Sequence, residues 1–132
     1  MRILFVCSGN AYRSPTAEAL LKKLRPDLQV DSAGTQVETR ISGEAREYLA
    51  RQNAGQYLKK APESLDAKQL SDYDLVVAME QRHKDGVLNK CPECRGKIVV
   101  WNIEDVGFRP PEYVEEINKQ IEGKVTELAK SL

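Results

Sequence analysis

Residues 3–15 of the chain read ILFVCSGNAYRSP. The run from Ile3 to Val6 is entirely apolar, which is typical of a strand buried on both faces of a parallel sheet. A short loop with one glycine follows, and Pro15 stands where the first turn of a helix tolerates proline. When a strand, a loop and a helix follow in this order, the N–H groups of the loop and of the first helical turn point at one spot and can bind an anion. The stretch therefore predicts an α/β fold with an anion-binding loop after its first strand.

Cys7 and Arg13 stand near the two ends of this loop, which we call the Cys7 loop (residues 7–14). A helix N-terminus and a guanidinium both favour the ionised thiolate, so Cys7 is expected to be a nucleophile near neutral pH. The planar guanidinium of Arg13 can bind two oxygens of one phosphate group. Gly9 allows a close backbone approach, and Asn10 is suited to a left-handed conformation. Ser14 is predicted to cap the helix and to donate a hydrogen bond to the thiolate.

The Cys7 loop resembles the signature of the low-molecular-weight protein tyrosine phosphatase family, Cys-x-Gly-Asn-x-x-Arg-Ser-Pro, at every fixed position. Three further segments are similar to the start of that family's first helix, the loop after its second strand and its third strand: Thr16–Ala19, Asp31–Thr35 and Asp74–Met79. The resemblance thus spans most of the chain. It implies a cysteine-dependent phosphatase that hydrolyses phosphoprotein monoesters, phosphotyrosine first among them, through a cysteinyl-phosphate intermediate.

The resemblance also implies roles for individual residues. Cys7, Arg13 and Asp105 are expected to be catalytic, with Asp105 protonating the leaving oxygen and later activating water. Val106 replaces the proline that normally follows this aspartate, and Glu104 is a neighbouring carboxylate that could be mistaken for the acid. Phosphate binding and support of the loop are assigned to Ser8, Gly9, Asn10, Ala11, Tyr12, Ser14 and Ser32. No metal or cofactor is expected, because the loop and Arg13 already neutralise the phosphoryl charge.

The hydrophobic pattern alternates between strands and helices along the chain. Strands are predicted at 3–6, 29–32, 75–79 and 98–101, and helical patterns at 17–24, 45–49, 80–88 and 114–132. We therefore predict one domain over residues 1–132, a doubly wound four-stranded parallel sheet of flavodoxin-like or Rossmann-like type with helices on both faces. In such sheets ligands bind outside the carboxyl ends of the strands, where the Cys7 loop and the loop at 102–111 both begin.

Composition sets limits on partners and location. The chain has 132 residues, with 20 Lys and Arg against 20 Asp and Glu, so no net charge attracts nucleic acid or an anionic membrane. No apolar stretch is long enough for a membrane span or a signal-peptide core. Three cysteines, one of them a required thiol, fit a reducing compartment. We expect a cytoplasmic monomer whose partner is a phosphorylated protein, with no nucleic-acid or membrane partner.

Several alternatives stay open. A protein arginine phosphatase is one, and Ser8 and Ala11, which replace aliphatic residues common in the family, indicate a wider and more polar pocket. An arsenate reductase of the same fold would use Cys91 and Cys94 as a redox relay, although Tyr12 stands where those enzymes carry a loop cysteine. A module that binds phosphate without chemistry would need neither a nucleophile nor an acid.

The two other cysteines and the histidine lie outside the Cys7 loop. Cys91 and Cys94 supply only half of a tetrahedral zinc site, so a reversible disulfide or two free thiols is expected. His83, the only histidine, is expected on the solvated surface of its helix. Members of the family often carry a histidine in the stretch matching Leu58–Ala61 that supports the loop asparagine. It is absent here, so Ser32 is expected to hold Asn10.

Overall fold

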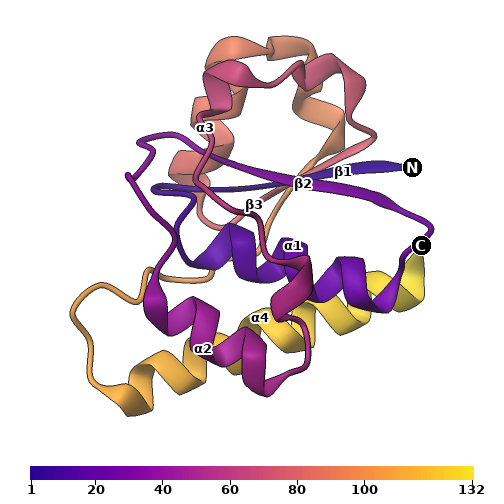
Figure 1. Ribbon diagram of the computed structural model, residues 1–132. Coiled ribbons are helices and arrows are strands. Elements are labelled where there is room, and N and C mark those ends of the chain that lie inside the picture. Colours follow the sequence, from indigo (N-terminus) through magenta and orange to yellow (C-terminus); the bar gives the residue numbers. More distant parts are fainter.

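The computed structural model describes residues 1–132 and contains one four-stranded sheet. The strands are β1 (Arg2–Cys7), β2 (Gln29–Gly34), β3 (Leu75–Ala78) and β4 (Ile98–Val100), in the order β2-β1-β3-β4. All three pairings are parallel. The chain reverses its direction of travel across the sheet after β2, which makes the sheet doubly wound, as predicted (Figure 1).

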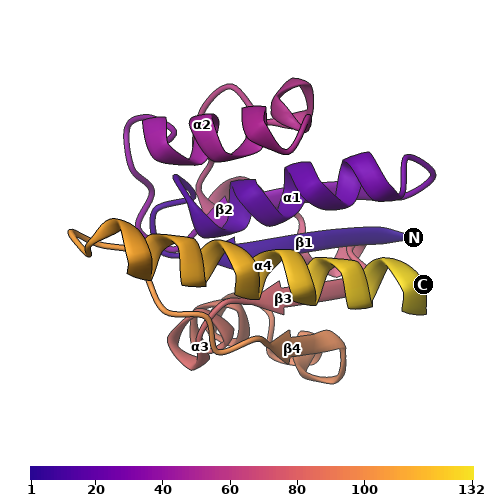
Figure 2. The ribbon, with the colours of Figure 1, turned by 90° about the horizontal axis from the view of Figure 1, so that it is seen from below.

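Helices cover both faces of the sheet. One face carries α1 (Arg13–Leu24), α2 (Gly43–Arg51) and α4 (Pro111–Ser131), which lie side by side in Figure 2. The other face carries α3 (Gln81–Lys90) and three of the four short 3₁₀ turns (Figure 1), whereas the turn at Gly55–Tyr57 packs against α1 and α2. None of the helices is both long enough and apolar enough to cross a lipid bilayer.

Successive side chains of β1 point to opposite faces and form two separate cores. Ile3 and Phe5 belong to a cluster of 21 buried residues shared with α1, α2 and α4. Leu4 and Val6 belong to a cluster of 12 buried residues shared with α3 and with the 3₁₀ turns at 65–67, 70–72 and 92–97. The uniformly apolar start of the sequence is therefore a strand buried on both sides.

The second strand is longer than predicted. It was expected to end at Ser32, but it stays paired with β1 as far as Gly34, which lies opposite Cys7. Four short 3₁₀ segments of three to six residues were not predicted, because segments this short have no hydrophobic period to detect. They are Gly55–Tyr57, Leu65–Ala67, Leu70–Asp72 and Pro92–Lys97.

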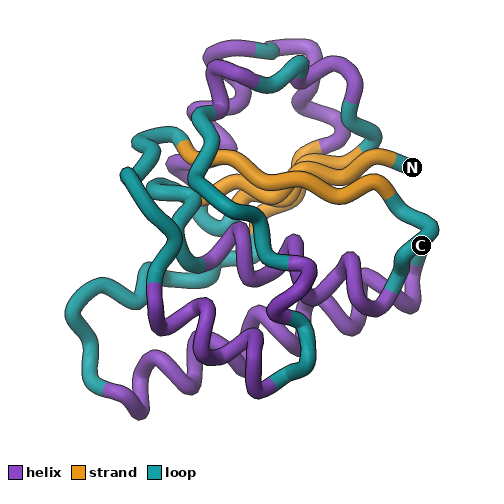
Figure 3. Tube along the Cα trace, in the orientation of Figure 1, coloured by secondary structure: helices purple, strands orange, loops and turns teal.

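The loops that follow the strands gather at the carboxyl edge of the sheet, on the left of Figure 3. Here the end of β2 packs directly against the backbone of the Cys7 loop. A Cβ atom on Gly34 would lie 2.5 Å from the carbonyl oxygen of Ser8 and 2.9 Å from the backbone nitrogen of Asn10. Only glycine permits this approach, and it lets the Thr35 and Gln36 N–H groups donate to the carbonyls of Cys7 and Ser8.

Candidate active site

Cys7 is the last residue of β1 and lies at the bottom of the site, with 2% of its surface exposed. Its Sγ lies 2.9 Å from Ser14 Oγ. Because Ser14 Oγ accepts a hydrogen bond from Asn10 Nδ2 at 2.8 Å, its own proton is free to be donated to the sulfur. The predicted capping role of Ser14 is wrong: α1 begins at Arg13, and the Ser14 hydroxyl, already inside the first turn, is occupied by Asn10 and Cys7.

Asn10 is buried and adopts the left-handed conformation expected of it, with φ of 54°. Its Nδ2 donates to Ser14 Oγ and to Ser32 Oγ, at 2.8 and 2.9 Å. Its Oδ1 accepts from Lys59 Nζ and from the backbone N–H of Glu63, both at 2.8 Å. An ammonium and a backbone N–H can only donate, so the orientation of the Asn10 amide is fixed.

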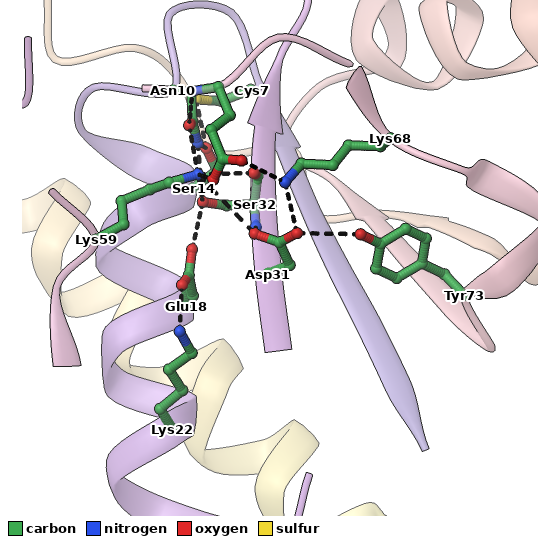
Figure 4. A network of polar contacts seen from close by, with 11 residues as sticks. Cys7, Asn10, Ser14, Glu18, Lys22, Asp31, Ser32, Lys59, Lys68 and Tyr73 are labelled. Carbon is green, nitrogen blue, oxygen red and sulfur yellow. Dashed lines mark hydrogen bonds and ion pairs between the residues drawn. The ribbon is translucent and has the colours of Figure 1, made fainter. Parts of the chain in front are cut away.

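The network continues away from the sulfur through buried groups (Figure 4). Ser32, predicted to support Asn10, does so, and its hydroxyl donates to Glu18 Oε1 at 2.5 Å. Lys59 was missed by the sequence analysis, although it stands in the stretch where the family histidine is absent. Besides Asn10, its ammonium binds the Ser32 carbonyl at 2.9 Å and the Glu63 carboxylate at 2.8 Å. A buried lysine thus holds the loop asparagine.

A second lysine completes the charge balance at this end of β2. Lys68 Nζ binds Asp31 Oδ2 at 2.6 Å (Figure 4). It also binds Glu63 Oε2 at 2.9 Å. Burial acts to raise the pKa of Asp31, but the hydrogen bonds from Lys68 and from the Ser32 N–H, together with the charges of Lys68 and Lys59, outweigh it and leave the pKa below its ordinary value. Burial and the neighbouring Asp31 raise the pKa of Tyr73 to about 12. Lys68 makes no contact with Asn10, which separates its role from that of Lys59.

Arg13 is 2% exposed and is held on the inner side of the site. Its Nη1 donates to Glu80 Oε1 at 2.6 Å and to the carbonyl of Ile103 at 2.8 Å. Burial acts to raise the pKa of Glu80, but hydrogen bonds from Arg13 and Arg82 outweigh it, so the pKa is lowered. Glu80 was missed as a site residue; its signal was a carboxylate directly after a buried strand.

The structure separates the two neighbouring carboxylates of the loop after β4. Asp105 Oδ2 lies 3.8 Å from Arg13 Nη2, and the Asp105 side chain is 54% exposed. Glu104 instead accepts a hydrogen bond from the hydroxyl of Tyr113 in α4. Asp105, the residue expected to be the acid, is therefore the one that faces the Cys7 loop.

These groups line one cavity of about 570 Å³. Its lining includes six of the predicted loop residues, Cys7, Ser8, Gly9, Ala11, Tyr12 and Arg13, together with Asp105 from the loop after β4. The predicted Asn10, Ser14 and Ser32 are buried and do not line it. Two arginines, Arg40 and Arg82, and two glutamates, Glu38 and Glu44, stand around it. A thiol, a guanidinium and a carboxylate thus share a single space, and these are the chemical groups that transfer of a phosphoryl group to sulfur and then to water would need.

His83 does not lie on the solvated surface, so that expectation is wrong. It is 1% exposed, because the first turn of α3 starts against the Cys7 loop rather than in solvent. Its Nδ1 accepts from the backbone N–H of Glu80 at 3.0 Å, and its Nε2 lies 2.9 Å from Ser8 Oγ. Burial, Arg13 and Arg82 together lower the pKa of His83 to about 4.

Cys91 and Cys94 form a disulfide, the first of the two expected options. Cys91 follows the last residue of α3, and Cys94 lies in the 3₁₀ turn that leads into β4. Since α3 begins at the carboxyl edge and runs back to the edge where β4 starts, about 12 Å of helix separates His83 from Cys91. The disulfide therefore lies at the opposite edge of the sheet from Cys7.

The whole chain matches a known family. Residues 2–132 fit the family model described as "Low molecular weight phosphotyrosine protein phosphatase". The chain is 34% identical over 135 residues to the protein-tyrosine-phosphatase Wzb of Salmonella typhimurium, which covers 98% of this chain and 88% of that protein. It is 38% identical over 104 residues to Wzb of Escherichia coli, covering 75% of this chain and 68% of that protein.

Solved structures show the same fold. Vibrio vulnificus Wzb in complex with benzylphosphonate superposes with a TM-score of 0.89 at 29% identity, covering 99% of this chain and 98% of that one. The YwlE arginine phosphatase from Geobacillus stearothermophilus superposes with a TM-score of 0.85 at 28% identity, covering 98% and 91%. This chain is therefore similar to proteins named for two different phosphorylated residues.

Proposed function

Because the chain belongs to the low molecular weight phosphotyrosine protein phosphatase family, we propose that it hydrolyses phosphorylated side chains of proteins, phosphotyrosine first, through a phosphocysteine at Cys7. The observation that carries this proposal is the convergence of Cys7, Arg13 and Asp105 on one cavity. The three come from the end of β1, the start of α1 and the loop after β4. Phosphate binding alone would need neither the thiol nor the acid.

In the first step, Cys7 Sγ attacks phosphorus while Arg13 and the N–H groups of the Cys7 loop hold the other phosphoryl oxygens. Ser14 donates to the sulfur and stabilises the thiolate before attack. Asp105, protonated, gives its proton to the departing oxygen as the P–O bond breaks. The product of this step is a cysteinyl phosphate.

In the second step, water attacks the phosphocysteine. Asp105, now ionised, takes a proton from the water, and Cys7 leaves as the thiolate that Ser14 stabilises again. Arg13 keeps its contact with Glu80 and Ile103 throughout, so its guanidinium is already aimed when the phosphate arrives. Such preorganised cations lower the barrier because no reorganisation is required during the reaction.

Phosphoarginine is the second candidate substrate. It is supported by the similarity to YwlE arginine phosphatases and by the small side chains of Ser8 and Ala11 on the cavity wall, of which Ser8 is polar. An arsenate reductase is less well supported, because a relay requires the cysteines to exchange disulfides. Disulfide partners need Cα atoms within about 7 Å, whereas Cys91 lies across the sheet from Cys7. We also propose that the protein acts as a monomer in the cytoplasm, where a thiol nucleophile stays reduced.

The test is a comparison of initial rates on phosphotyrosine, phosphoarginine and phosphoserine peptides, beside an assay of arsenate reduction. We expect turnover of the first or the second peptide, little of the third, and no arsenate reduction. Cys7→Ser should lose turnover by about 10³-fold or more and still bind inorganic phosphate, since a serine alkoxide is much harder to form than a thiolate. Substantial residual activity of Cys7→Ser on aryl phosphates would rule out the covalent mechanism.

A further inference from the structure

The only histidine of the chain is tied to the residue that follows the nucleophile. His83 Nε2 and Ser8 Oγ are 2.9 Å apart, although 75 positions separate the two residues in sequence. His83 does not line the cavity, whereas Ser8 does. Any effect of the histidine on substrate must therefore pass through the serine.

The contacts of His83 fix the direction of this hydrogen bond. A backbone N–H can only donate, so Nδ1, which accepts from the Glu80 N–H, carries no proton in the neutral ring. The ring is neutral near pH 7, because burial and the nearby Arg13 and Arg82 lower the pKa of His83 to about 4. The single ring proton is then on Nε2, which donates to Ser8 Oγ.

Ser8 consequently keeps its own hydroxyl proton. Its oxygen is occupied as an acceptor by His83, and that is the only side-chain hydrogen bond that Ser8 makes. No carboxylate or carbonyl of the protein takes the hydroxyl proton. Since Ser8 is only partly buried and lines the cavity beside Cys7 and Arg13, the proton is available there.

We propose that Ser8 is a substrate-binding residue whose hydroxyl, oriented by His83, donates a hydrogen bond to a phosphoryl oxygen. His83 is then a positioning residue, which acts through Ser8 and never touches substrate. A phosphoryl oxygen is the appropriate acceptor because Ser8 directly follows the nucleophile. In addition, Glu80 joins His83 to Arg13, which places the serine on the same side of the loop as the guanidinium. The inference rests on the proposed phosphatase function.

The first experiment measures competitive inhibition by inorganic phosphate in wild type, Ser8→Ala and Ser8→Thr. A hydrogen bond to a charged oxygen predicts a loss of roughly 10-fold or more in phosphate affinity for Ser8→Ala. Threonine keeps the hydroxyl and should restore affinity to within about threefold. The loss in kcat/KM should likewise be equal for phosphotyrosine and phosphoarginine substrates, which share the phosphoryl group. Unchanged phosphate affinity in Ser8→Ala, or a loss in kcat/KM confined to one of the two substrates, would overturn the proposal.

The second experiment tests the part played by His83. In a His83→Phe background, Ser8→Ala should lower the affinity for inorganic phosphate by less than about threefold, because the serine is no longer oriented. Additive losses would show that the two residues act independently. If His83→Phe does not fold, nitrogen-15 NMR of the single histidine gives a separate answer in the wild type. We expect the tautomer protonated at Nε2 near pH 7, and a ring protonated at Nδ1 would contradict the proposal.

The two proposals fail in different ways. A wild-type protein with no activity on any phosphorylated peptide would remove the proposed function. Normal wild-type activity together with unchanged phosphate affinity in Ser8→Ala would remove only the role of the serine.

Discussion

At the scale of single residues, the loop after β4 presents two carboxylates with different partners. Asp105 faces Arg13, while Glu104 is bonded to Tyr113. We predict that Asp105→Ala lowers turnover by about 10²–10⁴ for tyrosine phosphate, whose leaving group needs a proton. An activated phenol, which leaves without one, should show a much smaller loss in the cleavage step.

Glu104→Ala is the matched control for that experiment. It should change turnover little for either substrate, and it should keep the acidic limb of the pH profile that Asp105→Ala alters. Small and equal losses in both variants, whatever the leaving group, would mean that the proton comes from elsewhere.

Lys59 is the second residue whose role can be isolated. It holds Asn10, and Asn10 in turn makes Ser14 donate to Cys7. We predict that Lys59→Met lowers turnover about tenfold, and that it lowers the rate at which iodoacetate alkylates Cys7 at neutral pH, since the thiolate loses its oriented donor.

Lys68→Met separates this effect from simple loss of stability. Lys68 is about as buried as Lys59 and binds the same two carboxylates, Asp31 and Glu63, but it does not contact Asn10. Both variants should unfold at lower urea concentration, because each loses the ion pairs that its lysine makes with Asp31 and Glu63. Only Lys59→Met should change the alkylation rate, so equal rates in the two variants would refute the role of Lys59.

At the scale of elements, the close packing of the end of β2 against the Cys7 loop depends on Gly34. Gly34→Ala would bring a Cβ atom within 3 Å of the Ser8 and Asn10 backbones, and backbone atoms cannot rotate away. We expect a loss of about 2 kcal/mol or more in the free energy of unfolding, and at least a tenfold loss in kcat/KM.

Gly123→Ala gives the opposite sign and serves as the control. This glycine lies in the interior of α4, and a Cβ atom there meets nothing within 4 Å. Replacement by alanine should raise the free energy of unfolding by about 0.5–1 kcal/mol and leave kcat/KM unchanged. Urea unfolding followed by circular dichroism measures both variants.

The contacts of the Cys7 loop show why some residues of the site could be predicted from the sequence and others could not. Cys7, Asn10, Arg13 and Ser14 lie within one loop, so their spacing alone indicated how they would meet. Lys59, Glu80 and His83 are brought to that loop by the fold, from 49, 67 and 75 positions away from their partners. A polar residue on a helix is ordinarily solvated, which is why His83 was expected at the surface. Nothing in its local pattern indicated that the first turn of α3 packs against Ser8.

At the scale of the whole molecule, His83 also makes stability depend on pH. The pKa of His83 is about 4 in the folded protein and 6.5 in the reference state, so the unfolded chain binds a proton that the folded protein does not bind. The free energy of unfolding is therefore not reduced by this group above about pH 6.5. It falls as the pH falls from 6.5 toward 4, by at most about 3 kcal/mol.

Urea unfolding of wild type and His83→Phe at pH 7 and pH 4.5 tests this dependence. Both proteins contain the same carboxylates, and His83 is the only histidine. The difference between them therefore reports on His83. Wild type should lose more of its free energy of unfolding than the variant does between the two values. An equal loss would assign the acid sensitivity to the carboxylates.

The pairing of Cys91 with Cys94 has a practical consequence for counting active molecules. With that disulfide intact, Cys7 is the only free thiol in the chain. A thiol-specific reagent added without reductant would therefore label one sulfur per competent molecule. Bound phosphate should protect that sulfur, because it would cover Cys7 at the bottom of the cavity. The protected fraction would thus be a direct titration of working sites in any preparation, independent of the substrate used to assay it.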